Sequence, residues 1–189
     1  MNYQKHSELK GQHAFLGGSK YHWLYYDEEK LIDTYQNQLA VKRGIILHDF
    51  AARCIRIGQT LPRTQKTLNM YVNDAINFKM IPEQILFYSV NCFGTADAIS
   101  FRNNKLRIHD LKTGSTPAHM EQLLIYAALY CLENNANPNA IEVELRIYQN
   151  NDIIAYIPEA EEIRTVINKI IASDKIIEKI KDLEEPWYE

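Results

Sequence analysis

The chain has 189 residues, a length that predicts a single domain, 1–189, with enough core to fold without disulfide or metal staples. Hydrophobic residues make up 46% of the chain and charged residues 24%, which excludes a disordered, collagen-like or coiled-coil protein. The formal net charge is −3, so the chain as a whole is no polycation, and total charge does not by itself indicate a nucleic-acid partner.

The first third of the chain is predicted to be helical. Asp27 can cap a helix over residues 28–40, and Gly44 opens a second helical pattern that we expect to end at Gly58. A third helix is expected over residues 64–78.

The hydrophobic period then changes to that of strands. Strands are expected at 85–90, 95–101 and 106–111, and the asparagines of turn 102–105 tolerate the positive φ that a tight hairpin needs. Ser115, Thr116 and Pro117 predict a helix start, with the helix running to about residue 133. Strands 141–148 and 153–157 and a helix over 160–180 complete an α/β domain whose sheet contains antiparallel hairpins.

The sequence gives no indication of a membrane span, a signal segment or a cysteine-based metal site. No apolar run reaches the roughly 18 residues of a membrane span, and the polar N-terminus lacks a signal segment, so we expect no membrane partner and a cytoplasmic location. The three cysteines, Cys54, Cys92 and Cys131, form no CxxC pair and are too few to hold an iron–sulfur cluster or a four-cysteine zinc site. We expect reduced, buried thiols.

An acid and a lysine are predicted to share one strand face. Asp110 and Lys112 are two residues apart on a strand, and Asp97 lies on the neighbouring strand of the same hairpin. Carboxylates are the hard ligands that Mg²⁺ prefers, and a lysine beside them can orient water and offset phosphate charge, which is what phosphodiester hydrolysis needs. The alternative is an ordinary ion pair on a hairpin edge. Against it, Asp110 ends an apolar strand, where an unpaired carboxylate is costly.

His48 offers a third ligand for the same site. It lies on the apolar stripe of its predicted helix, where a purely solvated histidine is not expected. A core histidine with satisfied hydrogen bonds is the alternative.

The order of these residues resembles a known family. His48, Glu83, Gly-Thr-Ala-Asp97, Asp110-Leu-Lys112-Thr-Gly and Gln122-x-x-x-Tyr126 are arranged as in the PD-(D/E)xK nuclease superfamily, and most resemble its RecB, Cas4 and lambda-exonuclease-like branch. The resemblance implies a restriction-endonuclease-like αβββαβ core with a mixed sheet over about residues 44–150. The extra N-terminal helices and the C-terminal helix would be elaborations of this core.

The resemblance also assigns roles to residues. It implies that Mg²⁺ or Mn²⁺ is held by Asp97, Asp110, His48 and the backbone carbonyl of Leu111. Lys112 would position the attacking water.

Three further residues match motif positions that line the active site. Gln122 and Tyr126 lie one turn apart on one helix face, near where DNA binds in the family. Glu83 matches an acid that comes just before the first core strand. Core packing of Tyr126 and a solvated Glu83 remain alternatives.

Charge is segregated along the chain. Residues 42–79 contain seven Lys and Arg against two Asp, whereas residues 159–189 contain more acidic than basic side chains. We expect Lys42, Arg43, Arg53 and Arg56 to contact a phosphate backbone, with a solvated helix face as the alternative.

Together these features predict a Mg²⁺- or Mn²⁺-dependent deoxyribonuclease, namely an exonuclease acting on DNA ends in phage or bacterial recombination, repair or defence. The alternatives are a catalytically silent nuclease-fold module that binds DNA or protein, and a structure-specific endonuclease. The resemblance to lambda-type exonucleases also suggests a homo-oligomer and a recombination partner protein.

Overall fold

The computed structural model describes residues 4–114 and 116–184. It divides into two compact units, residues 1–45 and 46–189, which are treated separately below. Within the described ranges, no helix combines the length and the apolarity needed to cross a membrane.

The first unit is helical, as predicted. It contains the short 3₁₀ helices η1 (Ser7–Leu9) and η2 (Gly18–Tyr25) and the beginning of the long helix α1 (Glu28–Ile57). Asp27 caps α1, because its Oδ1 accepts a hydrogen bond from the Lys30 amide at 2.8 Å. Phe15 packs edge-on against Tyr35 with ring centroids 5.1 Å apart.

Helix α1 is continuous, so the predicted break between residues 40 and 44 is wrong. A glycine inside a helix costs about 1 kcal/mol relative to alanine, which weakens the helix without ending it. The predicted end at Gly58 is confirmed. Gly58 has φ +71°, and the Gln59 amide donates to the Cys54 carbonyl at 2.9 Å, which closes the last turn.

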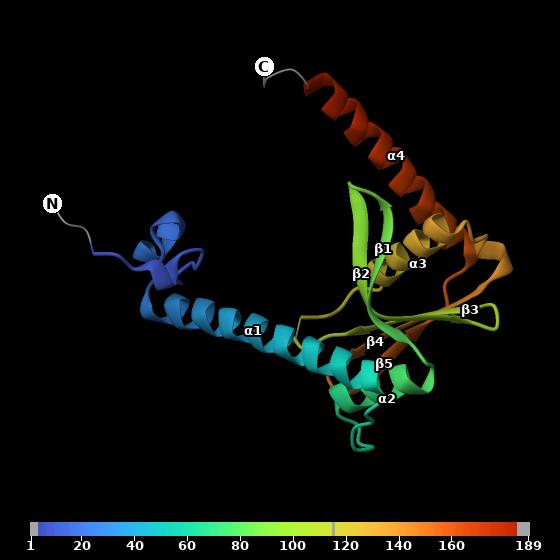
Figure 1. Cartoon of the computed structure of the whole chain (residues 1–189), viewed down its shortest axis with the longest axis horizontal. Coiled ribbons are helices and arrows are strands. Elements are labelled where there is room, and N and C mark those ends of the chain that lie inside the picture. The colour runs from blue at the N-terminus through green and yellow to red at the C-terminus, as the bar shows by residue number, and fades with distance from the viewer. Residues whose placement is uncertain (1–3, 115, 185–189) are drawn as a thin grey trace. The chain divides into compact units, whose positions relative to one another are not determined.

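The second unit is built on a five-stranded mixed sheet, which confirms the α/β prediction (Figure 1). The strands lie side by side in chain order: β1 (Ile81–Ser89), β2 (Cys92–Arg102), β3 (Lys105–Leu111), β4 (Glu142–Gln149) and β5 (Asp152–Tyr156). Strands β3 and β4 are parallel, and the other neighbours are antiparallel. Strand β1 begins four residues earlier than predicted.

The turns that join β2 to β3 and β4 to β5 are tight hairpins, and the first confirms the turn expected at residues 102–105. Asn103 and Asn104 have φ of 51° and 61°, and Asn150 and Asn151 have φ of 52° and 61°. Two successive positive φ values are those of a type I′ turn, which matches the twist of the strands it joins.

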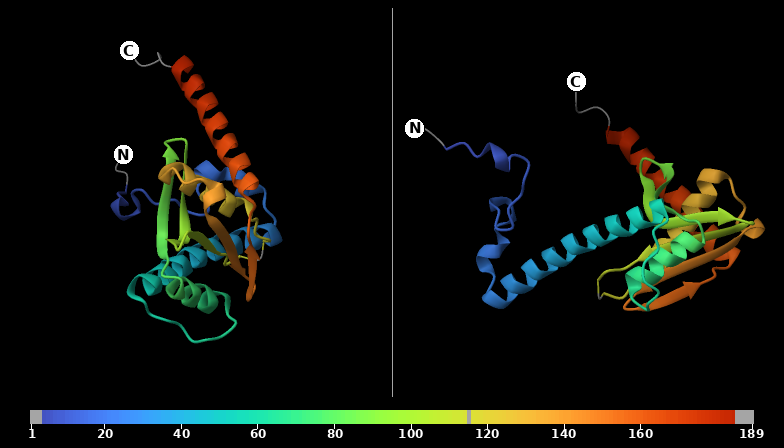
Figure 2. Two further views of the ribbon diagram at one scale, coloured as in Figure 1. Left: turned by 90° about the vertical axis from the view of Figure 1, so that its right-hand side faces the viewer. Right: turned by 60° about the horizontal axis from the view of Figure 1, so that its bottom comes forward.

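Helices cover the two faces of the sheet (Figures 1 and 2). On one face, α2 (Thr67–Asn77) and residues 46–57 of α1 enclose a core that includes Ala51, Val72 and Tyr148. On the other face, α3 (Glu121–Asn134) and α4 (Ala160–Glu184) enclose the larger core, and the short η3 (Pro138–Ala140) precedes β4. The strands that carry the predicted site motifs therefore belong to a sheet with a packed core on both faces.

Helix α3 starts later than the sequence predicts. Ser115 lies outside the described residues, and Thr116 and Pro117 precede a helix that begins only at Glu121. The Gln149 side chain holds the intervening loop in a non-helical form. Its Nε2 donates to the carbonyls of Gly114 and Thr116, both at 2.7 Å, and its Oε1 accepts from the Ala118 amide at 3.3 Å.

Candidate metal centre

Three side chains from α1, β1 and β2 converge at one point of the second unit. Ligand atoms of His48, Glu83 and Asp97 all lie within 4.8 Å of one another. One imidazole nitrogen and two carboxylates within that distance match the donor types of a divalent-metal site.

Glu83 reaches this point through an irregularity in β1. The prediction placed it just before the first core strand, whereas it lies inside β1 with φ +55°. Its neighbours Pro82 and Gln84 pair with Ala98 and Ala96, so Glu83 lies across from Asp97. A left-handed conformation at a glutamate is uncommon and is typical of functional sites, where the surrounding structure holds it.

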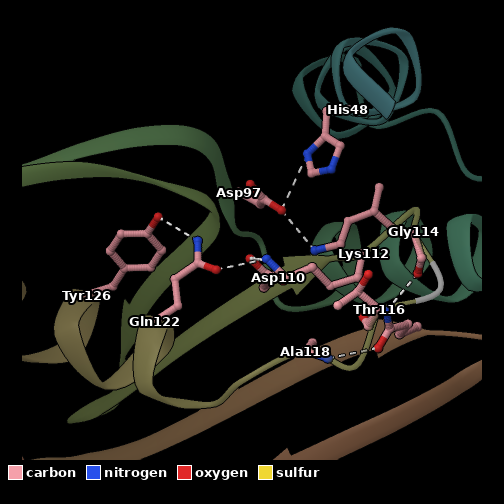
Figure 3. Close-up of polar contacts among 11 residues, drawn as sticks. His48, Asp97, Asp110, Lys112, Gly114, Thr116, Ala118, Gln122 and Tyr126 are labelled. Atoms are coloured by element: carbon pink, nitrogen blue, oxygen red, sulfur yellow. Dashed lines mark hydrogen bonds and ion pairs between the residues drawn. The ribbon is translucent and has the colours of Figure 1, made fainter. Parts of the chain in front are cut away.

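Asp97 is fixed by the backbone of the neighbouring strand. Its Oδ2 accepts a hydrogen bond from the Leu111 amide at 2.8 Å and lies 3.4 Å from His48 Nδ1 (Figure 3). The hydrogen bond that the imidazole donates to the Asp97 carboxylate is the main cause that raises the pKa of His48 above its usual value, against a smaller opposing effect of burial. Leu111 thus contributes an N–H that orients one of the carboxylates.

Asp110 and Lys112 project from the same face of the chain, as the two-residue spacing predicted. Asp110 is 2% exposed, and Lys112 Nζ lies 3.1 Å from its Oδ1 and 3.0 Å from its Oδ2. Burial first, and then the negative charge of Asp97, raise the pKa of Asp110. Asp110 is therefore a neighbour of the three-residue group, although its oxygens do not share the 4.8 Å geometry of that group in the described structure.

A chain of hydrogen bonds connects Lys112 to helix α3. Lys112 Nζ donates to Gln122 Oε1 at 2.8 Å, and Gln122 Nε2 donates to the Tyr126 hydroxyl at 2.9 Å (Figure 3). Gln122 and Tyr126 are one turn apart on α3, so the Gln122 amide and the Tyr126 hydroxyl lie on the same face of the helix. The side chain of Lys112 is thereby held between Asp110 and Gln122.

Gly94 makes room for the Tyr126 ring at the end of this hydrogen-bond chain, a role that was not predicted. A Cβ at Gly94 would lie 2.9 Å from Tyr126 Cε1, closer than real Cβ contacts occur. The absence of a side chain at position 94 therefore allows the Tyr126 ring to lie against β2. An isolated glycine inside a strand is the sequence signal for such a close approach.

The site has an excess of negative charge. Three carboxylates, Glu83, Asp97 and Asp110, lie near one another here, and the Lys112 ammonium pairs with Asp110 at 3.0 Å. Burial and the nearby Asp97 raise the pKa values of Glu83 and Asp110, and a cation would stabilise their charged forms, so the donor set fits Mg²⁺ or Mn²⁺.

The predicted DNA-contacting residues fall in both units. Arg53 and Arg56 are exposed on α1 in the second unit. Arg53 pairs with Asp49 at 2.6 Å. The positive charge of Arg56 partly offsets the burial and the Asp97 charge that raise the pKa of Glu83. Lys42 and Arg43 are exposed in the first unit. Contact of these four residues with DNA remains a prediction.

A second polar network lies on the face of the sheet that α2 covers, and sequence reasoning missed it. The Tyr148 hydroxyl donates to Asp74 at 2.7 Å and lies 3.2 Å from His109 Nδ1, while Arg146 pairs with both Asp74 and Glu144. Burial, followed by the charge of Arg146, lowers the pKa of His109 to about 3. No local pattern in the sequence connects residues so far apart.

The predicted cysteine environment holds in part. Cys54 and Cys131 are buried and Cys92 is half-buried, and all three are free thiols.

Comparison with known proteins gives no assignment for this chain. No family model, curated protein or solved structure matches it.

Proposed function

We propose that this protein is a Mg²⁺- or Mn²⁺-dependent deoxyribonuclease with a restriction-endonuclease-like core of the PD-(D/E)xK type, acting as an exonuclease on DNA ends. The observation that carries the proposal is one local arrangement. The ligand atoms of His48, Glu83 and Asp97 lie within 4.8 Å of one another, beside a buried Asp110 that is paired with Lys112.

The order of elements supports the same core. Helix α1 is followed by the antiparallel strands β1, β2 and β3, then by α3 and by β4 parallel to β3, which corresponds to αβββαβ with α2 as an insertion. The acids occur on β1, β2 and β3, and His48 comes from the preceding helix.

Different residues would have different roles in hydrolysis. Asp97, Glu83 and His48, with Asp110 next to them, would hold the cation. When bound, a divalent cation polarises the scissile phosphate and lowers the pKa of water beside it. Lys112, held between Asp110 and Gln122, orients that water and offsets the charge of the phosphate. A P–O bond forms to water, the P–O bond to the leaving nucleotide breaks, and the departing oxygen takes a proton.

A cleavage assay tests the proposal. Purified protein is incubated with end-labelled linear DNA, single-stranded and duplex, and with closed circles, in Mg²⁺, Mn²⁺ or EDTA. We expect metal-dependent cleavage of linear DNA, and Lys112→Ala should lower its rate by roughly 10²- to 10⁴-fold. Lys105→Ala is the matched control, because Lys105 begins the strand that Lys112 directly follows and pairs instead with Glu144 at 2.9 Å.

Three results would count against the proposal. Failure of the wild-type protein to cut any DNA would favour the catalytically silent binding module. Undiminished cleavage by Lys112→Ala would show that Lys112 does not orient the attacking water. Cleavage of closed circles at the rate of linear DNA would indicate an endonuclease.

A further inference from the structure

One face of the β1–β2 hairpin carries a row of side chains that begins at the candidate metal centre. The antiparallel register places residues of the two strands beside each other in three steps. In order from the carboxylates toward the hairpin tip, these are Glu83 beside Asp97, Ile85 opposite Thr95, and Phe87 opposite Phe93. All six belong to one face because side chains alternate along a strand.

The opposite face of the same hairpin is covered. Leu86 and Ala96 are buried in the core beneath α3, and Gly94 lies against the Tyr126 ring of that helix. Strand β3 pairs with β2 only from Ala98 onward, so residues 92–97 of β2 belong to a two-stranded arm (Figure 1). The face that carries the row is therefore separate from the packed core.

The far end of the row is aromatic and open to solvent. Phe93 is 61% exposed and Phe87 is 46% exposed, and their rings stack with centroids 6.4 Å apart and planes 30° apart. Ile85, between the rings and the carboxylates, is 57% exposed. Large apolar side chains gathered on one exposed surface mark a binding site more often than chance exposure.

The distance of the Phe87 and Phe93 rings from the carboxylates limits the chemical class of ligand that can lie along the row. Asp97 is four steps along β2 from Phe93, which corresponds to about 13 Å. A nucleic acid strand offers a phosphate to the carboxylate end and flat apolar bases to the aromatic end. A protein partner lying along this row would also lie over Glu83 and Asp97 and close the metal centre.

Resting on the proposed function, we infer that Phe87 and Phe93 form a platform on which unpaired bases of the substrate stack, a few nucleotides from the scissile phosphate. Bases within a duplex stack on one another and do not offer their faces to a protein, so the bound end of the DNA is single-stranded. Base–aromatic stacking tolerates any sequence, because every base has a π-face.

Binding without cleavage separates stacking from phosphate contacts. Fluorescence anisotropy in Ca²⁺ measures the affinity of the full chain for a short oligothymidylate and for an abasic oligonucleotide with the same phosphates. We expect Phe93→Ala to weaken oligothymidylate binding by roughly 5- to 150-fold, with little effect on the abasic strand. Phe101→Ala is the matched control, since Phe101 is an exposed aromatic of the same strand that packs against Tyr130 of α3.

The outcomes separate this inference from the proposed function. Wild-type cleavage together with unchanged oligothymidylate affinity of both Phe93→Ala and Phe87→Ala overturns the platform and leaves the nuclease intact. Loss of affinity in these variants without wild-type cleavage supports the platform and overturns the nuclease. If Phe93→Ala instead converts an oligomer to monomers in sedimentation and affects both oligonucleotides equally, the row is a protein interface and the inference is overturned.

Discussion

Replacing Gly94 by alanine tests whether the close approach of Tyr126 positions the hydrogen-bonded chain Lys112–Gln122–Tyr126. The added Cβ would lie 2.9 Å from Tyr126 Cε1, so the ring must retreat by about 0.5 Å to reach the 3.4 Å at which ordinary contacts begin. Overpacking of this kind costs about 1–3 kcal/mol. Alanine regains about 0.5–1 kcal/mol over glycine in a strand, so the net loss of stability should be about 1 kcal/mol.

The displacement of the ring should reach Lys112. The Tyr126 hydroxyl accepts from Gln122, and Gln122 accepts from Lys112, so a shifted ring changes the position of the ammonium. A misplacement of 1 Å can cost about 100-fold in rate, and half of that distance should cost on the order of tenfold.

Two assays measure these effects. Urea unfolding gives the stability of Gly94→Ala, and the DNA cleavage assay gives its rate, with Gly18→Ala as control because nothing lies within 4 Å of a Cβ there. The same substitution in a Tyr126→Leu background should cost about 1 kcal/mol less, since the ring that it strikes is gone. An equal cost of Gly94→Ala in both backgrounds would refute the packing argument.

Three further outcomes are expected. Lowering the pH from 7 to 5 should cost wild type about 2 kcal/mol more than His109→Gln in urea unfolding, because the pKa of His109 is lowered to about 3 and the unfolded chain alone takes up the proton; equal pH dependence would contradict this. Mn²⁺ at about 100 times its Kd should stabilise the wild type by about 2.7 kcal/mol in thermal unfolding, and Asp97→Asn should abolish the shift; a shift retained in this variant would place the ion elsewhere. Gln149→Ala should speed hydrogen exchange at the Ala118 amide, measured by NMR, by roughly 10- to 100-fold, and unchanged exchange would mean that other contacts hold the loop.

Local patterns predicted most of the framework. The asparagines at 103 and 104 predicted the hairpin between β2 and β3, because asparagine accepts positive φ. The shared face of Asp110 and Lys112 followed from the two-residue period of a strand, and their 3.0 Å contact confirms it.

The errors came where distant residues override a local signal. Thr116 and Pro117 have the chemistry of a helix start, yet Gln149, more than thirty residues away in sequence, holds their loop extended. Glu83 lies inside β1 and not before it, and its backbone has a positive φ. No residue type in that stretch predicts such an irregularity. The close contact of Gly94 with Tyr126 likewise depends on how α3 packs on the hairpin.

The backbone of Glu83 has a consequence for engineering. A left-handed conformation costs a glutamate roughly 1–3 kcal/mol and costs glycine almost nothing, so programmes that search for more heat-resistant variants will favour glycine at position 83. The substitution would raise the melting temperature and remove a carboxylate from the metal centre in one step. Selection for thermal tolerance alone would thus remove the Glu83 carboxylate, whereas selection for the proposed nuclease activity would keep the strained glutamate.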